Sequence, residues 1–457
     1  ETTEEALVLT ETGVNTGIFN AYMLFDETGS VSADGKLQVD RGDKLVARYR
    51  DPSDDFGNVA NETSTSFYGL TVINGGSLLG NTTWSTSGSP YLLTGDITVP
   101  NTVTLTIESG VEVRFTPLTD DLSSGEDVNR IELIIEGVLR VKGAQSDTVT
   151  FMSNGQVPAS GDWYGIVSTG NTGKVLVDYA SINHYTNGVR IKDGSWTSVR
   201  NNGDTISVSH TKFYGGGSAV SADWNGSYRP VIFTYNKLVE CGISDYSESS
   251  YKEYSHNAFV AGVNYQTLRT RAQDGYASGA NGEVKIEHNT FTKGYIEVDN
   301  TYAYDNQMSV KVNSNSLGRG SQGIYISTSN YSSTKSDMSI EVSQNSVVGR
   351  TSSFSSGRGV GLYTYGDYGS NIKIENNTIR AIGRGVYLYS EKSSHGLIKS
   401  NTIDSTYYQG IYLDKISGRV ESNTITKCGR FSYFGMEITS DFNYPSIDTI
   451  QYNTITG

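Results

Sequence analysis

The sequence predicts an all-β solenoid, a chain of short strands that stack coil upon coil. The composition is the first reason, because 51 glycines and 31 tyrosines against only 7 prolines are typical of β structure with many turns. The second is a short phrase around an asparagine that returns after 21 residues (Asn236 to Asn257) or as many as 32 (Asn257 to Asn289). The third is the alternation of valine or isoleucine with polar residues before that asparagine, which is the period of a half-buried strand. A unit this short cannot bury its own apolar face, so the units must stack.

The first 72 residues differ from the rest of the chain. The stretches "EALVLTETGVNTGIFNAYMLF" and "GKLQVDRGDKLVARYRDPSDDFGN" alternate apolar and polar residues around Gly and Asp turns. This segment resembles the second half of the immunoglobulin-like modules of microbial surface proteins, and the resemblance implies a partial Ig-like β-sandwich over residues 1–72. The earlier strands of such a module would precede Glu1. We therefore expect either a chain cut at that point or a missing strand supplied by another copy, since an unpaired sheet edge is a docking site.

Two motifs in this segment suggest ligands. The "RGD" of Arg41 to Asp43 is interpreted as a turn before a strand rather than as an integrin signal. The stretch "DPSDDFGN" gathers Asp51, Asp54, Asp55 and Asn58, whose oxygens are of the kind that calcium takes. Calcium and a solvated acidic turn are the two interpretations of this cluster.

Residues 73–457 hold the repeat. We expect each asparagine to mark a turn, because asparagine tolerates the left-handed backbone conformation, and we expect stacking to join the amides in an internal hydrogen-bonded ladder. Thr211 and Ala180 occupy the aligned position in two weaker copies. The ladder residues are Asn236, Asn257, Asn289, Asn315, Asn345, Asn377, Asn401, Asn423 and Asn453.

This pattern resembles the right-handed parallel β-helix of the pectate-lyase-like family. The stretches "TGDITVPNTVTLTIESGVEVRF", "IELIIEGVLRVKG" and "GDWYGIV" resemble the opening coils of secreted β-helix proteins. The resemblance covers roughly residues 75 to 457 and implies an extracellular or cell-surface location. Cys241 and Cys428 would lie about eight coils apart, which is too far for a disulfide, so we expect two separate thiols.

Enzymes of this family act on polysaccharides through residues that project outward from one sheet. Here the outward position follows each Gly-apolar step, and it predicts a row of Arg190, Ser244, Asn264, Tyr325, Tyr363, Tyr387, Tyr412 and Glu437. Hydrolysis would need a pair of carboxyl groups there, and four of the positions carry tyrosine. Such a tyrosine ladder suits protein packing or stacking on sugar rings. The alternative is that the rings only stabilise the sheet.

Other fragments of catalytic motifs are weaker, and we assign no catalytic residue. The "RIK" of Arg190 to Lys192, with His184 nearby, matches one polygalacturonase motif without its companions. Arg269, Arg271 and Asp274 are the best remaining set for a lyase, with a solvated loop as the alternative. Sequons for glycosylation occur at Asn61, Asn81, Asn225, Asn330 and Asn376.

The net charge of -14 argues against nucleic acid and anionic membranes as partners. No apolar run is long enough to span a membrane, although the start at Glu1 leaves room for an anchor or signal outside this sequence. Because the last coil ends on "NTITG" without a polar cap, we expect self-association by end-on stacking or strand complementation.

These observations predict an extracellular structural or adhesive surface protein, a rod that assembles into a filament, sheath or surface layer. The alternative is a polysaccharide-active enzyme (lyase, hydrolase or epimerase) acting on uronate-containing polymers. A secreted or phage carbohydrate-binding rod is a third interpretation. Calcium is the one cofactor that the sequence indicates.

Overall fold

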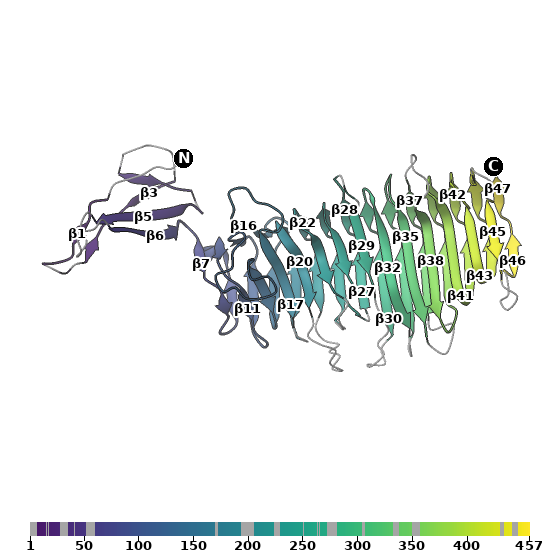
Figure 1. The fold of residues 1–457 in the computed structure, drawn as a ribbon, viewed down its shortest axis with the longest axis horizontal. Coiled ribbons are helices and arrows are strands. Elements are labelled where there is room, and N and C mark those ends of the chain that lie inside the picture. Colours follow the sequence, from purple (N-terminus) through teal and green to yellow (C-terminus); the bar gives the residue numbers. More distant parts are fainter. Residues whose placement is uncertain are drawn as a thin grey trace.

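The repeat folds into a long parallel solenoid with three strands in each coil (Figure 1). The computed structural model describes residues 7–14, 16, 18–27, 35–40, 42–51, 60–169, 172–192, 205–223, 229–249, 251–262, 264, 266–271, 281–303, 307–331, 338–349, 357–429, 434–440 and 447–457. Each strand pairs in parallel with its counterparts in the coils before and after it, so the described strands form three columns. In chain order a coil passes through columns A, B and C.

The strands of column A are β8 (Gly76–Ser77), β11 (Ile97–Val99), β14 (Glu132–Ile135), β17 (Trp163–Thr169), β20 (Tyr185–Lys192), β23 (Ser218–Ala222), β26 (Gly242–Asp245), β29 (Gln266–Thr270), β32 (Gly294–Ala303), β35 (Gly323–Asn330), β38 (Arg358–Gly366), the first part of β41 (Arg384–Lys399), the first part of β43 (Ile411–Glu421) and β45 (Met436–Thr439). Those of column B are β9 (Thr82–Trp84), β12 (Thr104–Glu108), β15 (Val138–Lys142), β18 (Lys174–Asp178), β21 (Ile206–Ser209), β24 (Val231–Thr234), β27 (Tyr251–Ser255), β30 (Gly282–Glu287), β33 (Met308–Asn313), β36 (Met338–Ser343), β39 (Asn371–Glu375), the later parts of β41 and β43, and β46 (Thr449–Gln451).

Column C is a sheet of its own: β7 (Thr71–Ile73), β10 (Tyr91–Leu93), β13 (Glu112–Phe115), β16 (Val149–Ser153), β19 (Ala180–Asn183), β22 (Lys212–Tyr214), β25 (Lys237–Val239), β28 (Ala258–Val260), β31 (Thr290–Phe291), β34 (Ser316–Leu317), β37 (Ser346–Val348), β40 (Thr378–Arg380), β42 (Thr402–Asp404), β44 (Thr424–Thr426) and β47 (Thr454–Thr456). The single short helix among the described residues is η1 (Thr86–Gly88).

The core is a set of apolar stacks inside the three columns. Val312, Val342 and Ile374 lie in register on consecutive column B strands, and all three are fully buried. Because each inward side chain rests on the same kind of side chain in the next coil, the alternation in the sequence is enough to build a continuous core.

The asparagine ladder runs along the turn between columns B and C. From Asn236 to Asn453, the side-chain Nδ2 of each ladder residue donates to Oδ1 of the next at 2.9–3.1 Å. The backbone N of each donates to the same oxygen, and Thr211 N begins the series by donating to Asn236 Oδ1 at 2.9 Å. The amides therefore satisfy backbone groups that the turn would otherwise leave unpaired inside the rod.

The left-handed residue of these turns is not the asparagine. It is the residue before it, such as His288, Gln344 and Asn376, with φ values of 56°, 58° and 58°. The prediction that the asparagine adopts the left-handed conformation was wrong, because its place is decided by the hydrogen bonds of its side chain.

The described strands before the solenoid form three separate two-stranded sheets. These are β1 (Thr10–Glu11) with β2 (Phe19–Asn20), β3 (Leu24–Asp26) with β4 (Lys36–Gln38), and β5 (Lys44–Asp51) with β6 (Ala60–Phe67). The β3–β4 pair is parallel, whereas Ig-like sheets are antiparallel. The Ig-like prediction is therefore not confirmed.

Gly42 and Asp43 lie before strand β5, where the turn was expected; Gly42 has a φ of 102°, and Asp43 N donates to Asp40 O. Arg41 of the "RGD" lies outside the described residues.

The predicted calcium cluster is not described well enough to be placed. Asp54, Asp55 and Asn58 lie outside the described residues, and only the backbone of Asp51, at the end of β5, is described. Within the described ranges, no group of three or more His, Cys, Asp or Glu is arranged to hold a metal ion. No helix in that part of the chain is both long and apolar enough to cross a membrane.

Candidate binding face

The outward row of column A is set by the pairing register. Running along the rod it contains Arg190, Ser221, Ser244, Arg269, Glu297, Tyr325, Gly361, Tyr387, Tyr412 and Glu437. Two predicted residues are replaced in this row, and Ser221 and Glu297 are additions to it. Asn264 lies before β29, so Arg269 takes its place. Tyr363 lies two residues further along β38, and Gly361 takes its place. The reason is that "RGVGLY" of β38 pairs in register with "RGVYLY" of β41, so the alternation starts from Gly359 and not from Gly361.

The four predicted tyrosines are nevertheless in contact. The ring centroids lie 5.4 Å apart between Tyr325 and Tyr363, 5.5 Å between Tyr363 and Tyr387, and 4.8 Å between Tyr387 and Tyr412. All four side chains are half-buried on the outer surface. Burial raises the pKa of Tyr363 to about 12, so its hydroxyl stays protonated and able to donate a hydrogen bond.

Two arginines lie between these rings. Arg358 places its guanidinium carbon 5.2 Å from the Tyr363 ring centroid and 4.9 Å from that of Tyr387. Arg384 lies 5.1 Å from Tyr387 and 5.0 Å from Tyr408. These distances are within the range of cation–π attraction, so each cation is held between two rings. We call Tyr325, Arg358, Tyr363, Arg384, Tyr387, Tyr408 and Tyr412 the tyrosine–arginine face.

Gly361 makes room for this arrangement. A Cβ at this position would lie 2.6 Å from Cδ of Arg358, a distance that side-chain carbons do not tolerate. The missing side chain therefore lets Arg358 lie flat across the sheet between its tyrosines.

A groove of about 410 Å³ adjoins the face. It is lined by Arg269, Tyr295, Glu297, Asp299, Gln322, Gly323, Ile324, Tyr325, Gly357 and Arg358. Ile296 and Val298 of β32 are buried, so Glu297 and Asp299 both project outward, and their Cα atoms are roughly 7 Å apart along the strand. Arg269 Nε lies 2.7 Å from Glu297 Oε2.

The groove gives the face a pair of carboxylates that the sequence analysis missed. In the strand "GYIEVDN" two apolar residues, Ile296 and Val298, alternate with Glu297 and Asp299, one residue later after the glycine than in "GIYI". That signal would have placed Glu297 and Asp299 outward.

Arg190 and Lys192 of the "RIK" fragment belong to an ion-pair network. Glu126, on the segment after β13, lies 2.7 Å from Lys192 Nζ and 3.4 Å from Arg190 Nε, and it accepts a 2.6 Å hydrogen bond from Tyr164. Burial raises the pKa of Glu126, but the hydrogen bonds from Lys192 and Tyr164 outweigh it, and the net shift is downward. Arg190 also pairs with Asp223. The two cations therefore pin this segment to the sheet.

The other catalytic fragments do not form a site. His184 packs edge-on against Tyr214. Arg271 is buried, with its guanidinium 5.4 Å from the Tyr302 ring and 3.9 Å from Glu248. Asp274 lies outside the described residues.

Two of the five sequons offer exposed asparagines, Asn81 and Asn376. Asn330 is fully buried and donates to Gly369 O at 2.8 Å, which excludes glycosylation in the fold. Asn61 is described only in its backbone, and Asn225 lies outside the described residues.

A column of rings along the ladder turns was also missed. Tyr179, His210, Tyr235, His256 and His288 stack with centroid distances of 4.4, 5.2, 4.5 and 4.8 Å. From His210 onward these side chains are exposed. The sequence signal for this column was a tyrosine or histidine directly before the aligned asparagine position in five consecutive units.

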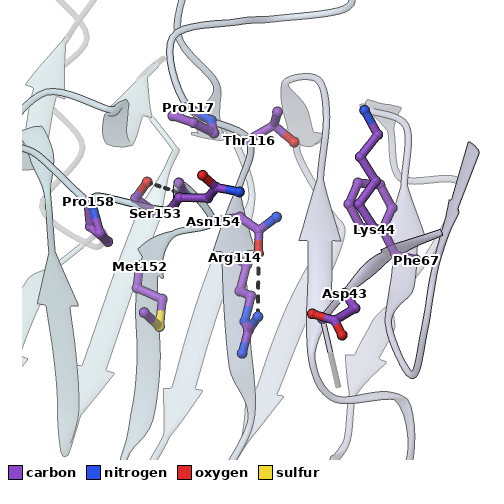
Figure 2. A pocket seen from close by; sticks show the side chains of 13 residues that line it. Asp43, Lys44, Phe67, Arg114, Thr116, Pro117, Met152, Ser153, Asn154 and Pro158 are labelled. Carbon is purple, nitrogen blue, oxygen red and sulfur yellow. Dashed lines mark hydrogen bonds between the residues drawn. The ribbon is translucent and has the colours of Figure 1, made fainter. Parts of the chain in front are cut away.

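A cavity of about 510 Å³ lies where β5 and β6 meet the first coils (Figure 2). Asp43, Lys44 and Phe67 line one side, and Arg114 and Asn154 line the other (Figure 2). Arg114 is ion-paired with Glu112, and its Nη1 lies 3.4 Å from Asn154 Oδ1. A Cβ on Gly42 would collide with the same guanidinium. The cavity therefore lies at the contact between the strands before the solenoid and its first coils.

The two cysteines are free thiols. Cys241 is buried and Cys428 is half-buried. Burial raises the pKa of Cys241 to about 11 and also raises that of Cys428, so neither is an activated nucleophile.

Comparison with known proteins agrees with the fold. Residues 305–457 match the family model described as right handed beta helix region, and residues 76–216 match that of the pectate-lyase like beta helix domain. No curated protein and no solved structure matches the chain. The solenoid is thus a right-handed parallel β-helix with a domain of pectate-lyase-like type in its first coils, and such domains fit both surface proteins and polysaccharide enzymes.

Proposed function

We propose that this β-helix is an extracellular structural or adhesive surface rod, and that its tyrosine–arginine face attaches it to polysaccharide. The observation that carries the proposal is the alternation of arginines and tyrosines along column A. Each guanidinium lies about 5 Å from two rings. The face is therefore held in place before a partner arrives, and little side-chain freedom is lost on binding.

The chemistry of the face suits sugar. Aromatic rings offer apolar surface to the C–H face of a pyranose, and phenol and guanidinium groups offer hydrogen bonds to its hydroxyls. The rings follow the rod axis from Tyr325 to Tyr412. A polymer laid along that axis could contact several rings at once, which raises the overall affinity without strong single contacts.

Self-association is part of the same proposal. We propose that copies join by end-on stacking or by strand complementation into a filament, sheath or surface layer. Size-exclusion chromatography and electron microscopy of native material test this directly, since polymers would support it and discrete monomers at all concentrations would contradict it.

The second candidate is a polysaccharide-active enzyme acting on uronate-containing polymers. It is favoured by one observation, the side-by-side Glu297 and Asp299 in a groove that also holds Arg269 and Arg358. Two carboxyl groups are the minimum for glycoside hydrolysis. Against it, the carboxylate of Glu297 is already engaged by the guanidinium of Arg269 at 2.7 Å, so it is not free to contact a leaving group.

The test is affinity electrophoresis of the protein through gels that contain different polysaccharides. We expect retardation by at least one polymer and a fall in affinity of about tenfold in Tyr387→Ala, equivalent to the loss of roughly 1.4 kcal/mol. Tyr452→Ala is the matched control, because Tyr452 is exposed and lies outside the face. Equal retardation of both variants and the wild type would contradict the proposal.

A further inference from the structure

One coil carries a lysine and an aspartate inside the rod. Lys252, the second residue of β27, occupies an inward position in register with Val231 before it and Val284 after it. Asp245 is the last residue of β26 in the same coil. Both side chains have no exposed surface, and Lys252 Nζ lies 3.0 Å from Asp245 Oδ1. Two charges at this depth are costly to keep, even as a pair.

The polar groups around this pair converge on the carboxyl of Asp245. Ser247 donates to Oδ1 from its backbone N at 3.0 Å and from its Oγ at 2.6 Å. Tyr254 donates from its hydroxyl to Oδ2. Lys252 Nζ also donates to the backbone oxygen of Asp245 at 3.1 Å. These contacts hold the amine in hydrogen-bond contact with the carboxyl whose carbon it would attack.

We propose that Lys252 and Asp245 react with each other in the folded protein to form an intramolecular isopeptide bond. The bond joins Nζ of Lys252 to Cγ of Asp245. It ties β26 to β27, and so closes the corner between columns A and B in this coil covalently.

The step balances without an oxidant or a cofactor. A proton passes from the ammonium to the carboxylate and leaves a neutral amine and a carboxylic acid, which are the reactive forms. The Nζ lone pair attacks Cγ, the bond from Cγ to one oxygen breaks, and that oxygen leaves as water with two hydrogens. The products are one amide and one water molecule.

The surroundings favour each part of this step. Burial lowers the pKa of Lys252 to about 8, against the opposing effect of Asp245, so the neutral amine is accessible. Ser247 supplies two donors to Oδ1, where negative charge develops as the amine attacks. Burial raises the pKa of Tyr254 well above its usual value, so its hydroxyl remains a donor to Oδ2, the oxygen that leaves. The product amide also removes two buried charges.

The mass of the full-length folded protein tests the proposal. We expect the intact chain to be lighter than its sequence requires by one water molecule. Trypsin cleaves after a free Lys252 and would give peptides 238–252 and 253–269. The bonded chain would instead give a single peptide 238–269 that lacks one water.

Two controls make the result specific. Lys285 lies 3.0 Å from Glu283 but is a partly exposed pair, so trypsin should cleave after it in the same digest. Lys252→Met should have its full calculated mass, and Asp245→Asn should lose ammonia instead of water.

A wild-type mass equal to the calculated one, with free cleavage after Lys252, would overturn the proposal. So would a loss of water that persists in Lys252→Met, since it would belong to another residue. The wild-type digest decides the question even if a variant fails to fold.

Discussion

The asparagine ladder should be a main determinant of the stability of the rod, and Asn345 in its middle is the place to test it. The perturbation is Asn345→Ala. The wild-type side chain accepts from Asn315 N at 2.9 Å and from Asn315 Nδ2 at 3.0 Å, and it donates to Val312 O at 2.7 Å and to Asn377 Oδ1 at 3.0 Å. All of these groups lie inside the rod, so alanine removes four buried hydrogen bonds.

At about 1 kcal/mol for each net hydrogen bond, the loss should be roughly 4 kcal/mol. The assay is urea unfolding, together with amide hydrogen exchange to localise the effect. We expect the amide of Asn315 to lose protection, because its acceptor is removed, while coils far from the substitution keep theirs.

The matched control is Asn376→Gly. Asn376 is the same residue type on the equivalent turn one coil further on, but it is exposed and has a φ of 58°, which glycine adopts without cost. We expect a change below about 1 kcal/mol. The reasoning is refuted if Asn345→Ala is as mild as the control, or if the control is as costly as Asn345→Ala.

Three further predictions follow from buried groups. Burial raises the pKa of Glu132 to about 7, so its protonated form contributes stability that is full below about pH 4.5 and is lost as the pH rises through 7. The free energy of unfolding of Glu132→Gln should therefore equal that of the wild type near pH 4.5 and exceed it by up to about 3 kcal/mol at pH 8, as measured by thermal or urea unfolding. A difference that stays constant across this pH range would contradict the argument. Gly385→Ala should lower the free energy of unfolding by about 1–3 kcal/mol, because its Cβ would lie 2.3 Å from a backbone oxygen of the next coil. Gly80→Ala is the control and should be close to neutral, because a Cβ there would meet nothing within 4 Å. Equal effects of the two substitutions would contradict the packing argument. Cys241 and Cys428 should react slowly with a thiol reagent until the chain is unfolded; fast labelling of the native protein would show that the thiols are not shielded.

The fold was accessible from the sequence because one residue type repeats at a position with one physical task. A buried asparagine between two strands predicts a stacked turn, and the structure joins all nine such asparagines in one ladder. The left-handed backbone conformation was assigned to the wrong residue of the turn. The residue that adopts it, before each asparagine, is Gln, Ser, His, Tyr or Asn, so it has no common residue type that the sequence would reveal. The Ig-like prediction depended on resemblance alone, and the strands found there pair differently.

The outer face was harder to predict, because register along a solenoid is decided by bulges and loop lengths. Tyr363 was predicted on the row because the second glycine of "RGVGLY" was taken as the start of the alternation, whereas the pairing with "RGVYLY" starts it at the first. Arg269 was missed in the row because "GVN" was aligned in place of β29, the strand that follows it. Glu297 was missed because the strand "GYIEVDN" was not included in the row. Lys252 could have been found, since strict alternation in "YKEYSHN" points Lys252 and Tyr254 inward together.

The central claim is that the tyrosine–arginine face holds polysaccharide without cleaving it. The most direct measurement is the chain length of a retained polysaccharide, followed by size-exclusion chromatography during prolonged incubation with the protein. The account predicts a polymer of unchanged length that stays bound to the wild type and is released from Tyr387→Ala. A polymer that shortens with time, by a reaction that Glu297→Gln abolishes, would contradict it and identify the groove as an active site.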